Sequence, residues 1–410
     1  MSLKQIVIFE PYCEGHKLFH CRRIARCLCA HDCKVILATR KACFHHPLIL
    51  SMRRELGTMY ELLEIPDCTW EHRLIRSKRW FVSQLGYYLW FCLRARGPIQ
   101  KKCPEYIFIP YLDYFVYAAG LLGSPFHQTR WGGMLMSLRI GYQEMGIRIH
   151  RYHKLRILKE YAFLRLIQHG HIDTVFSIQE PPVRYIERTR PHLSSRFQYV
   201  PDPIPELKKI KKETARAVFH LPEGKILILL YGEISLRKGL KELIESFRQS
   251  TFPPDVDLIL AGRQTEDGTQ YLNTQWPQHL MDENRLFIIN RFIDDEEESI
   301  LFSACDIVWV AYKNFSLSSG VLYLAAEMGR PVIGSACGLI EYTIEKEKIG
   351  MTVDLDNEVS IINAISILSA DKQRYKICQE NALKLAKKHD EQIFIDQISN
   401  KILMAISTKA

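Results

Sequence analysis

The chain has no apolar run long enough to cross a membrane. The longest candidate, residues 86–93, is less than half of the ~18 residues that a spanning helix needs. The first apolar stretch is only about four residues long and is followed by Glu10, so we expect no secretory signal peptide. With 21 glycines and 18 prolines in 410 residues, the sequence is neither collagen-like nor of low complexity. We therefore expect a soluble, cytoplasmic globular protein.

The ligand spacing of a zinc module is also missing. Nine of the twelve cysteines lie at or before Cys103, and several alternate with His16, His20 and His31, but no C-x-x-C pair occurs. Zinc modules need regular spacing, so the pattern favours reduced, mostly buried thiols over a metal site. Residues 255–257 have the spacing Asp-x-Asp, but they lie at the start of a predicted strand. Open α/β sheets bind ligands at the carboxyl ends of their strands, which is the opposite edge. No metal is expected.

Acidic residues are scarce in the first half of the chain. The net charge of +9 divides into +15 for residues 1–200 and −6 for residues 201–410. A basic half attracts an anionic partner, such as a membrane surface, a nucleic acid or a phosphorylated acceptor. The basic residues are spread over helices without a nucleic-acid reader motif, so no nucleic-acid partner is expected.

Two series of alternating strands and helices are present. The first begins with a strand at residues 5–11, a helix at 15–30 and a strand at 34–39, with later strands at 106–110 and 174–178. The second contains five strands among its helices; they are predicted at residues 225–232, 256–262, 285–290, 307–312 and 331–336.

The fold class follows from these two series. We predict an α/β protein with two Rossmann-like, doubly wound parallel sheets facing a central cleft. The proline-rich segment at residues 200–206 marks the boundary. The expected domains are 1–199, 200–375 and the helices of 376–410, which pack back towards the first domain.

A loop of small residues opens one helix of the second series. Ser318, Ser319, Gly320 and Val321 follow the strand at 307–312. Such residues let backbone N–H groups approach a phosphate, which the helix dipole also attracts. An ordinary capped helix start is the alternative.

A second loop repeats this arrangement with cations. Gly232 ends a strand, and Arg237 and Lys238 precede the next helix. Adjacent cations at the carboxyl end of a strand suit a diphosphate. A solvated basic loop is the alternative, but together with the serine loop the pair favours phosphate binding.

In combination these motifs resemble the retaining glycosyltransferases of the GT-B fold, group 1, a glycosyltransferase family 4-like pattern. The resemblance covers most of residues 200–375. The shared positions are Gly232, Lys238-Gly239, Cys305-Asp306, Ala311-Tyr312, Ser319-Gly320, Gly329-Arg330-Pro331-Val332 and Gly338-Leu339-Ile340-Glu341. It implies a nucleotide-diphosphate sugar donor of the UDP or GDP type, no other cofactor, no obligatory metal, and transfer with retention. It also implies base contacts from Arg291 and Ile293.

The family usually carries two glutamates around the serine loop, and this sequence lacks both. Counting back from Gly329 places them at Ser316 and Leu324, and Glu327 comes nearly one helical turn too late. The arginine that follows the strand's glycine in the family is replaced here by Glu233, and we expect Arg237 to supply the positive charge of that arginine. Hydroxyl and main-chain contacts from Ser316 and the serines that follow it would then hold the donor.

The resemblance also implies sites in the amino half. His127 is the candidate for the polar residue near the sugar, and Arg237 and Lys238 complete the catalytic set. Four further residues are expected on the acceptor side, namely Gly15, His16, Asp113 and Arg130. A lone histidine is more often structural, and for His16 packing at the helix start stays an equal alternative.

A basic, aromatic helix is predicted at residues 77–96. Such a helix lies in a membrane interface or packs in the core with solvated charged ends. The basic first half favours a peripheral contact with an anionic membrane, at the inner face of the cell membrane.

Three functions fit the sequence. The first is a hexosyltransferase-type glycosyltransferase that acts on a carbohydrate or lipid-linked glycan in cell-surface polysaccharide or glycolipid synthesis. The second is a catalytically weak or inactive sugar-nucleotide-binding partner protein, supported by the missing glutamates. A GT-B epimerase or phosphorylase ranks last, because no lysine motif for a pyridoxal cofactor is found.

Overall fold

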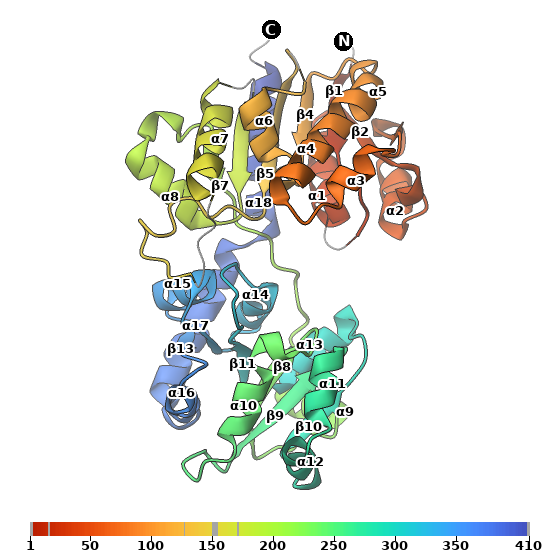
Figure 1. Cartoon of the computed structure of the whole chain (residues 1–410). Coiled ribbons are helices and arrows are strands. Elements are labelled where there is room, and N and C mark those ends of the chain that lie inside the picture. The colour runs from red at the N-terminus through yellow and green to blue at the C-terminus, as the bar shows by residue number, and fades with distance from the viewer. Residues whose placement is uncertain (1–2, 15–16, 127, 150–154, 170–171, 408–410) are drawn as a thin grey trace. The chain divides into compact units, whose positions relative to one another are not determined.

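The structure is a computed structural model that describes residues 3–14, 17–126, 128–149, 155–169 and 172–407. It divides into two compact units. The first comprises Met1–Met145, His153–Asp202 and Gln392–Ala410, and the second comprises Gly146–Tyr152 and Pro203–Glu391. Each unit is built around one parallel sheet (Figure 1).

The first sheet has seven strands in the order β3-β2-β1-β4-β5-β6-β7. Every pair of neighbours is parallel. The strands are β1 (Lys4–Phe9), β2 (Cys33–Arg40), β3 (Tyr60–Ile65), β4 (Tyr106–Ile109), β5 (Arg130–Leu135), β6 (Ile172–Ser177) and β7 (Phe197–Tyr199).

Helices cover both faces of this sheet because its strands are apolar on both sides. In β1, Ile6 and Ile8 pack against α1, α2 and α18, whereas Val7 and Phe9 pack on the opposite face, which α4 to α8 cover. The helices are α1 (Lys17–Ala30), α2 (Pro47–Leu56), α3 (Glu71–Ile75), α4 (Trp80–Trp90), α5 (Arg96–Gln100), α6 (Val116–Leu122), α7 (Arg156–His169), α8 (Glu180–Thr189) and α18 (Glu391–Ser407).

Short helical turns complete the first unit. They are η1 (Lys41–Cys43), η2 (Gly57–Met59), the π-helical turn η3 (Phe91–Ala95), η4 (Leu112–Tyr114) and η5 (Pro191–Leu193).

The second sheet has six strands in the order β10-β9-β8-β11-β12-β13, again with parallel neighbours. This order reverses direction after β8, which is the topology of a doubly wound fold. The strands are β8 (Ile226–Tyr231), β9 (Val256–Ala261), β10 (Leu286–Ile289), β11 (Ile307–Val310), β12 (Val332–Ser335) and β13 (Gly350–Val353).

The second sheet is also covered on both faces. Leu227 and Leu229 of β8 pack with α9, α13, α14 and α17, while Ile228 and Leu230 pack with α10, α11, α12 and α16. The helices are α9 (Lys212–Val218), η6 (Leu236–Lys238), α10 (Leu240–Ser246), α11 (Glu266–Leu272), α12 (Gln275–Asp282), α13 (Asp295–Ala304), α14 (Gly320–Glu327), α15 (Gly338–Glu347), α16 (Glu358–Ala370) and α17 (Lys372–Lys388).

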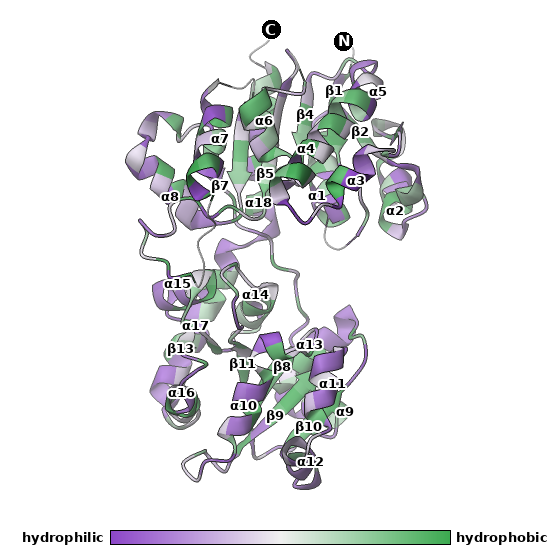
Figure 2. Ribbon diagram, in the orientation of Figure 1, coloured by the Kyte–Doolittle hydropathy of each residue, from purple (hydrophilic) through white to green (hydrophobic). Residues whose placement is uncertain are grey.

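Figure 2 shows the hydropathy pattern that results, with green strands inside and purple residues on outward faces of the helices. The two predicted parallel sheets are confirmed. The chain passes from the first unit to the second between Asp202 and Pro203. Its tail divides, because α17 packs on the second core whereas Phe394, Ile398 and Ile402 of α18 are buried in the first.

Four strands were not predicted from the sequence, namely β3, β5, β7 and β13. In β5 and β13 one reason is glycine, which is a poor strand former in isolation. In β5 (RWGGML), a Cβ on Gly133 would lie 2.7 Å from the carbonyl oxygen of Ile109. In β13, a Cβ on Gly350 would lie 1.9 Å from the carbonyl oxygen of Val332. These glycines are required by the close approach of neighbouring backbones, which local propensity does not reveal.

The aromatic helix α4 is more deeply packed than the membrane-surface prediction requires. Trp90 is buried, and its Nε1 donates a hydrogen bond of 3.1 Å to the carbonyl oxygen of Pro66. Phe91 is fully buried, and the half-buried Trp80 makes an edge contact with Tyr117. Trp90 and Phe91 therefore follow the core-packing alternative, whereas Phe81 of the same segment is exposed.

The structure also describes the cysteines and the length and hydropathy of the helices. All twelve cysteines are free thiols, of which six are buried, five are half-buried and Cys103 is exposed. Within the described ranges, no helix is long and apolar enough to span a membrane.

Candidate functional site

The carboxyl edge of the second sheet begins with the loop after β8. Gly232 continues the ladder, donating its amide to Ala261, and has a φ of +88°. Gly239 ends η6 with a φ of +67°, and a Cβ there would lie 2.6 Å from the carbonyl oxygen of Ala311. Glycine at 239 thus lets the cationic turn η6 pack directly on the end of β11.

Lys238 lies inside this turn rather than on its surface. The residue is 7% exposed, its Nζ donates a hydrogen bond to the carbonyl oxygen of Tyr231, and it lies 5.6 Å from the ring centroid of Tyr312. Burial, with a further effect from Arg237, lowers the pKa of Lys238 to about 8, while Glu233 opposes the change. A buried ammonium of this kind is stabilised by an anion.

Arg237 is the exposed partner of this lysine. Its guanidinium lies 5.8 Å from the ring centroid of Tyr312 and 5.7 Å from that of Phe315. Its carbonyl oxygen accepts a hydrogen bond of 2.7 Å from the amide of Lys313. The end of β11 thereby orients both cations of η6.

Tyr312 joins the cations to the serine loop. Its hydroxyl lies 3.1 Å from the Oγ of Ser319, and both side chains are buried. The structure therefore brings Arg237, Lys238 and Ser319 into one group around a single ring.

The start of α14 is open at its first residue. Ser319 is the N-cap but makes no side-chain cap bond, because its Oγ is engaged by Tyr312. Gly320 is exposed, and a Cβ there would meet no atom within 4 Å. Ser318 and Val321 beside it are half-buried. This arrangement leaves helix amides accessible to an anion.

The loop after β12 packs on the serine loop. A Cβ on Gly338 would lie 2.5 Å from the Cα of Ser316, and the amide of Leu339 donates to the Ser316 carbonyl oxygen at 3.3 Å. The carbonyl oxygen of Arg148 accepts a hydrogen bond of 2.7 Å from the Gly338 amide. The Arg148 guanidinium pairs with buried Glu341, which raises the pKa of Arg148.

The positions of the missing glutamates have apolar or neutral surroundings. Ser316 is buried against Gly338, and Leu324 packs in the core beneath α14. Glu327 is half-buried on the same helix, and burial raises its pKa while Lys209 lowers it. The helix does not shift to bring Glu327 to the position of Leu324.

The predicted base contacts differ from each other in exposure. Arg291 is exposed and forms a two-pronged ion pair with Glu297 of α13. Ile293 is buried in the core, directly before the capping box in which Asp294 and Glu297 begin α13. Of this pair, only Arg291 presents its side chain at the surface.

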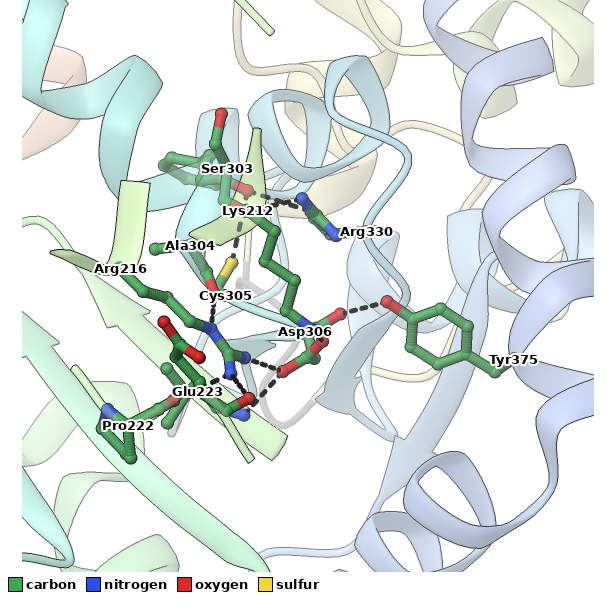
Figure 3. Close-up of polar contacts among 12 residues, drawn as sticks. Lys212, Arg216, Pro222, Glu223, Ser303, Ala304, Cys305, Asp306, Arg330 and Tyr375 are labelled. Carbon is green, nitrogen blue, oxygen red and sulfur yellow. Dashed lines mark hydrogen bonds and ion pairs between the residues drawn. The ribbon is translucent and has the colours of Figure 1, made fainter. Parts of the chain in front are cut away.

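Asp306 lies at the amino edge of the second sheet, opposite the candidate site. It precedes β11, and Figure 3 shows its carboxylate accepting hydrogen bonds from Lys212 and from Arg216 (2.7 Å). The Leu227 amide donates a further hydrogen bond of 2.8 Å to the same carboxylate. Arg216 is itself buried and donates to the carbonyl oxygens of Ala304, Pro222 and Glu223. Asp306 therefore has a structural role.

Of the candidates of the first unit, the structure describes Asp113 and Arg130. Gly15, His16 and His127 lie outside the described residues. Both oxygens of Asp113 accept backbone amides, from Met136 at 2.8 Å and Ser137 at 3.0 Å, so it fixes the loop after β5.

The structure corrects the prediction that Arg130 lies on the acceptor side of the site. It is the first residue of β5, so it lies at the amino edge of the sheet and not at the carboxyl edge. Its guanidinium donates a hydrogen bond to the carbonyl oxygen of Ala405 in α18. The glycine-rich strand that it begins was not recognised from the sequence, which placed Arg130 in a loop.

One acidic pair at the edge of the second sheet was overlooked. Asp354 and Asp356 follow β13, and the Asp356 amide donates to Oδ1 of Asp354 at 3.0 Å. Their spacing is visible in the sequence, but β13 was not. Within the described residues, no three histidine, cysteine, aspartate or glutamate residues gather as a metal would require.

Comparison with known proteins agrees with this geometry. Residues 211–385, inside the second unit, match the family Glycosyl transferases group 1. No curated protein sequence matches the chain.

Solved structures resemble the whole chain at low identity. Sucrose-phosphate synthase from Thermosynechococcus elongatus has a TM-score of 0.65 at 18% identity, covering 99% of this chain and 100% of that one. HepE from Anabaena, in complex with UDP, has a TM-score of 0.66 at 15% identity over 98% and 100%. WaaG, a glycosyltransferase involved in lipopolysaccharide biosynthesis, has 0.60 at 15% over 96% and 98%. Residues 211–385 thus match the group 1 glycosyltransferases, and the chain has the GT-B fold.

Proposed function

We propose that this protein transfers a sugar from a nucleotide-diphosphate sugar, of the UDP or GDP type, to a carbohydrate or lipid-linked glycan. The observation that carries the proposal is the group formed by Arg237, Lys238 and Ser319 around Tyr312. It combines a buried ammonium, an exposed guanidinium and an open helix start at one sheet edge, which suits a diphosphate. The UDP and UDP-glucose complexes of HepE support this donor class.

In the proposed reaction, the two cations of η6 stabilise the leaving diphosphate. As the bond between the anomeric carbon and the diphosphate oxygen breaks, negative charge develops on the diphosphate. Lys238 and Arg237 stabilise that charge, with the amide of Gly320 as a neutral donor. The acceptor hydroxyl forms the new bond to the anomeric carbon, and its proton passes to an oxygen of the departing diphosphate. We propose retention of configuration, and a hexosyl group as the sugar that is transferred.

We propose no metal or additional cofactor for this step. Two positive charges on η6 offset the diphosphate charge that a divalent cation neutralises in other transferases. Turnover is therefore expected to survive EDTA.

The proposal also covers where in the cell the enzyme acts and which synthesis it serves. Three exposed cations, Arg76, Lys78 and Arg79, precede α4, and they suit a weak contact with an anionic membrane. Twelve free thiols agree with a reducing compartment. We propose a cytoplasmic enzyme at the inner face of the cell membrane, in cell-surface polysaccharide or glycolipid synthesis.

A second function has one specific observation in its favour. Ser316 and Leu324 occupy the positions of the family's two glutamates, and Glu327 does not replace either. A partner protein that binds a sugar nucleotide without transferring it would show this pattern.

A donor screen separates the two functions. The full chain is incubated with UDP-, GDP-, ADP- and TDP-sugars, with and without EDTA, in the presence of a panel of glycan and lipid-linked acceptors. Nucleotide release and thermal stabilisation are both measured. Release supports the transferase, whereas stabilisation without release under any acceptor supports the partner protein. Absence of both effects contradicts either function.

A further inference from the structure

Two cysteines of the first unit follow neighbouring strands of its sheet. Cys13 lies four residues after the end of β1, and Cys43 closes η1, three residues after the end of β2. These strands are paired in parallel, with Phe9 opposite Ala38 (Figure 1). Because paired strands lie about 4.8 Å apart, the loops that follow them begin side by side.

Hydrogen bonds hold the thiol of Cys43 against the loop after β1. Its Sγ donates a hydrogen bond of 3.7 Å to the carbonyl oxygen of Pro11, two residues before Cys13. It also makes a side-chain hydrogen bond with Cys13 itself. Both cysteine side chains pack on the same apolar cluster, which surrounds β1 and β2. The two thiols are therefore direct neighbours.

The two thiols differ in exposure. Cys13 is half-buried, whereas Cys43 is only 3% exposed. Burial and the hydrogen bond with Cys13 raise the pKa of Cys43 to about 11, against smaller lowering effects of Thr39 and Arg40. Cys13 is thus the thiol that a small oxidant reaches from solvent, and Cys43 is a protected thiol behind it. Such a pair has the arrangement of a peroxide-sensing cysteine and its resolving cysteine.

We propose that Cys13 and Cys43 form a redox-modification site, which hydrogen peroxide converts from a dithiol into a disulfide. The peroxide transfers one oxygen atom to the sulfur of Cys13, which becomes a sulfenic acid, and one water molecule leaves. The sulfur of Cys43 then attacks that of Cys13. The S–S bond forms, the S–O bond breaks, and the hydroxyl group leaves with the Cys43 proton as a second water molecule. The two thiols lose two electrons, and the peroxide gains them.

The disulfide connects the loop after β1 covalently to η1. Cys13 lies four residues before Lys17, where α1 begins, so the bond restrains the chain that enters this helix. A thiol reductant reverses the reaction. In a reducing compartment the dithiol is therefore the resting form, and the disulfide forms when peroxide rises. This inference goes beyond the proposed function and does not depend on it, because it concerns sulfur chemistry of the first unit.

Other thiols of the chain have different surroundings. Cys29 and Cys33 influence each other electrostatically, but their thiols donate to the carbonyl oxygens of Met59 and His31, each at 3.5 Å. Cys103 is exposed, and a small oxidant reaches it directly. These three cysteines are therefore suitable comparisons in an oxidation experiment on the same chain.

The test maps disulfides in the full chain after oxidation. The chain is reduced with dithiothreitol, desalted, treated with hydrogen peroxide, blocked with iodoacetamide and digested with trypsin in the absence of reductant. Cys13 and Cys43 fall into separate tryptic peptides, residues 5–17 and 42–53, each with a single cysteine. Their disulfide therefore gives one cross-linked peptide pair, with the combined mass less two hydrogen atoms. Cys13→Ser and Cys43→Ala remove the pair, and Cys29→Ser and Cys103→Ser are the matched controls.

We expect peroxide to cross-link residues 5–17 with residues 42–53 in the unmodified chain and in both controls, and dithiothreitol to remove the cross-link. Cys13→Ser and Cys43→Ala should each lose it completely. Circular dichroism checks the folding of the variants, and Cys13→Ser, at the half-buried position, is sufficient if the buried Cys43→Ala unfolds. The site is overturned if the two peptides stay unlinked at peroxide concentrations that oxidise Cys103. A cross-link from Cys13 to a third cysteine in the unmodified chain would overturn it as well.

Discussion

The ammonium of Lys238 lies 5.6 Å from the ring centroid of Tyr312, and the hydroxyl of that ring reaches Ser319 at 3.1 Å. One aromatic side chain at the end of β11 thereby fixes the cationic turn relative to the start of α14. Both features were separate motifs in the sequence, and the ring between them joins them into one group at the sheet edge.

Removal of either cation should weaken nucleotide-diphosphate binding. Arg237→Ala and Lys238→Ala each lose a charge-assisted contact, which costs about 1.5–3 kcal/mol, or roughly ten- to a hundredfold in Kd. Calorimetry with UDP and GDP measures the effect, and Lys241→Ala, at an exposed lysine of α10, is the control. Unchanged affinity in both variants would remove the phosphate assignment.

Affinity for a sugar nucleotide should fall as the pH rises through about 8. The pKa of Lys238 is lowered to about 8, so the side chain is charged below that pH and increasingly neutral above it. UDP-glucose and GDP-mannose are suitable ligands, because their diphosphates keep the same charge over this range. Lys238→Arg should flatten the profile, since arginine stays protonated. A profile that is equally steep in this variant would assign the titration to another group.

Loss of the Asp306 carboxylate should destabilise the second unit without a direct effect on the site. Asp306→Ala leaves the buried guanidinium of Arg216 without its counter-charge, which costs about 3–5 kcal/mol. Chemical denaturation measures this loss, with Asp295→Ala at an exposed aspartate as the control. If Asp306→Ala unfolds like the unmodified chain but no longer binds nucleotide, Asp306 belongs to the site instead.

The stability of the first unit should depend on the protonation of Glu10. Its pKa in the folded chain is raised from 4.5 to about 7, so the folded state holds the proton more tightly than the unfolded state does. The unfolding free energy should therefore fall by up to about 3 kcal/mol as the pH rises from about 4.5 to 7. Urea unfolding at a series of pH values measures the slope, which Glu10→Gln should reduce and Glu14→Gln should leave unchanged.

Vesicle binding should depend on the cations before α4 and not on Trp90. Each cation near an anionic surface contributes about 1 kcal/mol, screened over ~8 Å at physiological salt. Replacing Arg76, Lys78 and Arg79 by serine should lower co-sedimentation with anionic vesicles by roughly two orders of magnitude. Replacing Lys372, Arg374 and Lys376, three exposed cations of α17, by serine is the matched control. Equal binding to anionic and neutral vesicles would contradict the membrane part of the proposal.

The sequence by itself determined the two parallel sheets and the positions of the candidate site residues at the ends of their strands. Strands such as β1, β8 and β11 are buried on both faces, so they are continuous apolar runs that can be recognised without knowledge of their neighbours. The cations and serines of the site follow strand ends directly, and in a parallel sheet all such ends lie at one edge.

The tertiary structure decided what depends on contacts between distant residues. Gly133 and Gly350 belong to strands only because another backbone approaches them closely, and Trp90 is buried only because α4 packs against the sheet. Glu10 belongs to no motif that the sequence reveals, yet the fold surrounds it with tyrosines such as Tyr114, which follows β4, and Tyr87 of α4. Periodicity and local motifs carry no information about such neighbours, because burial and pKa are set by which segments the fold places side by side.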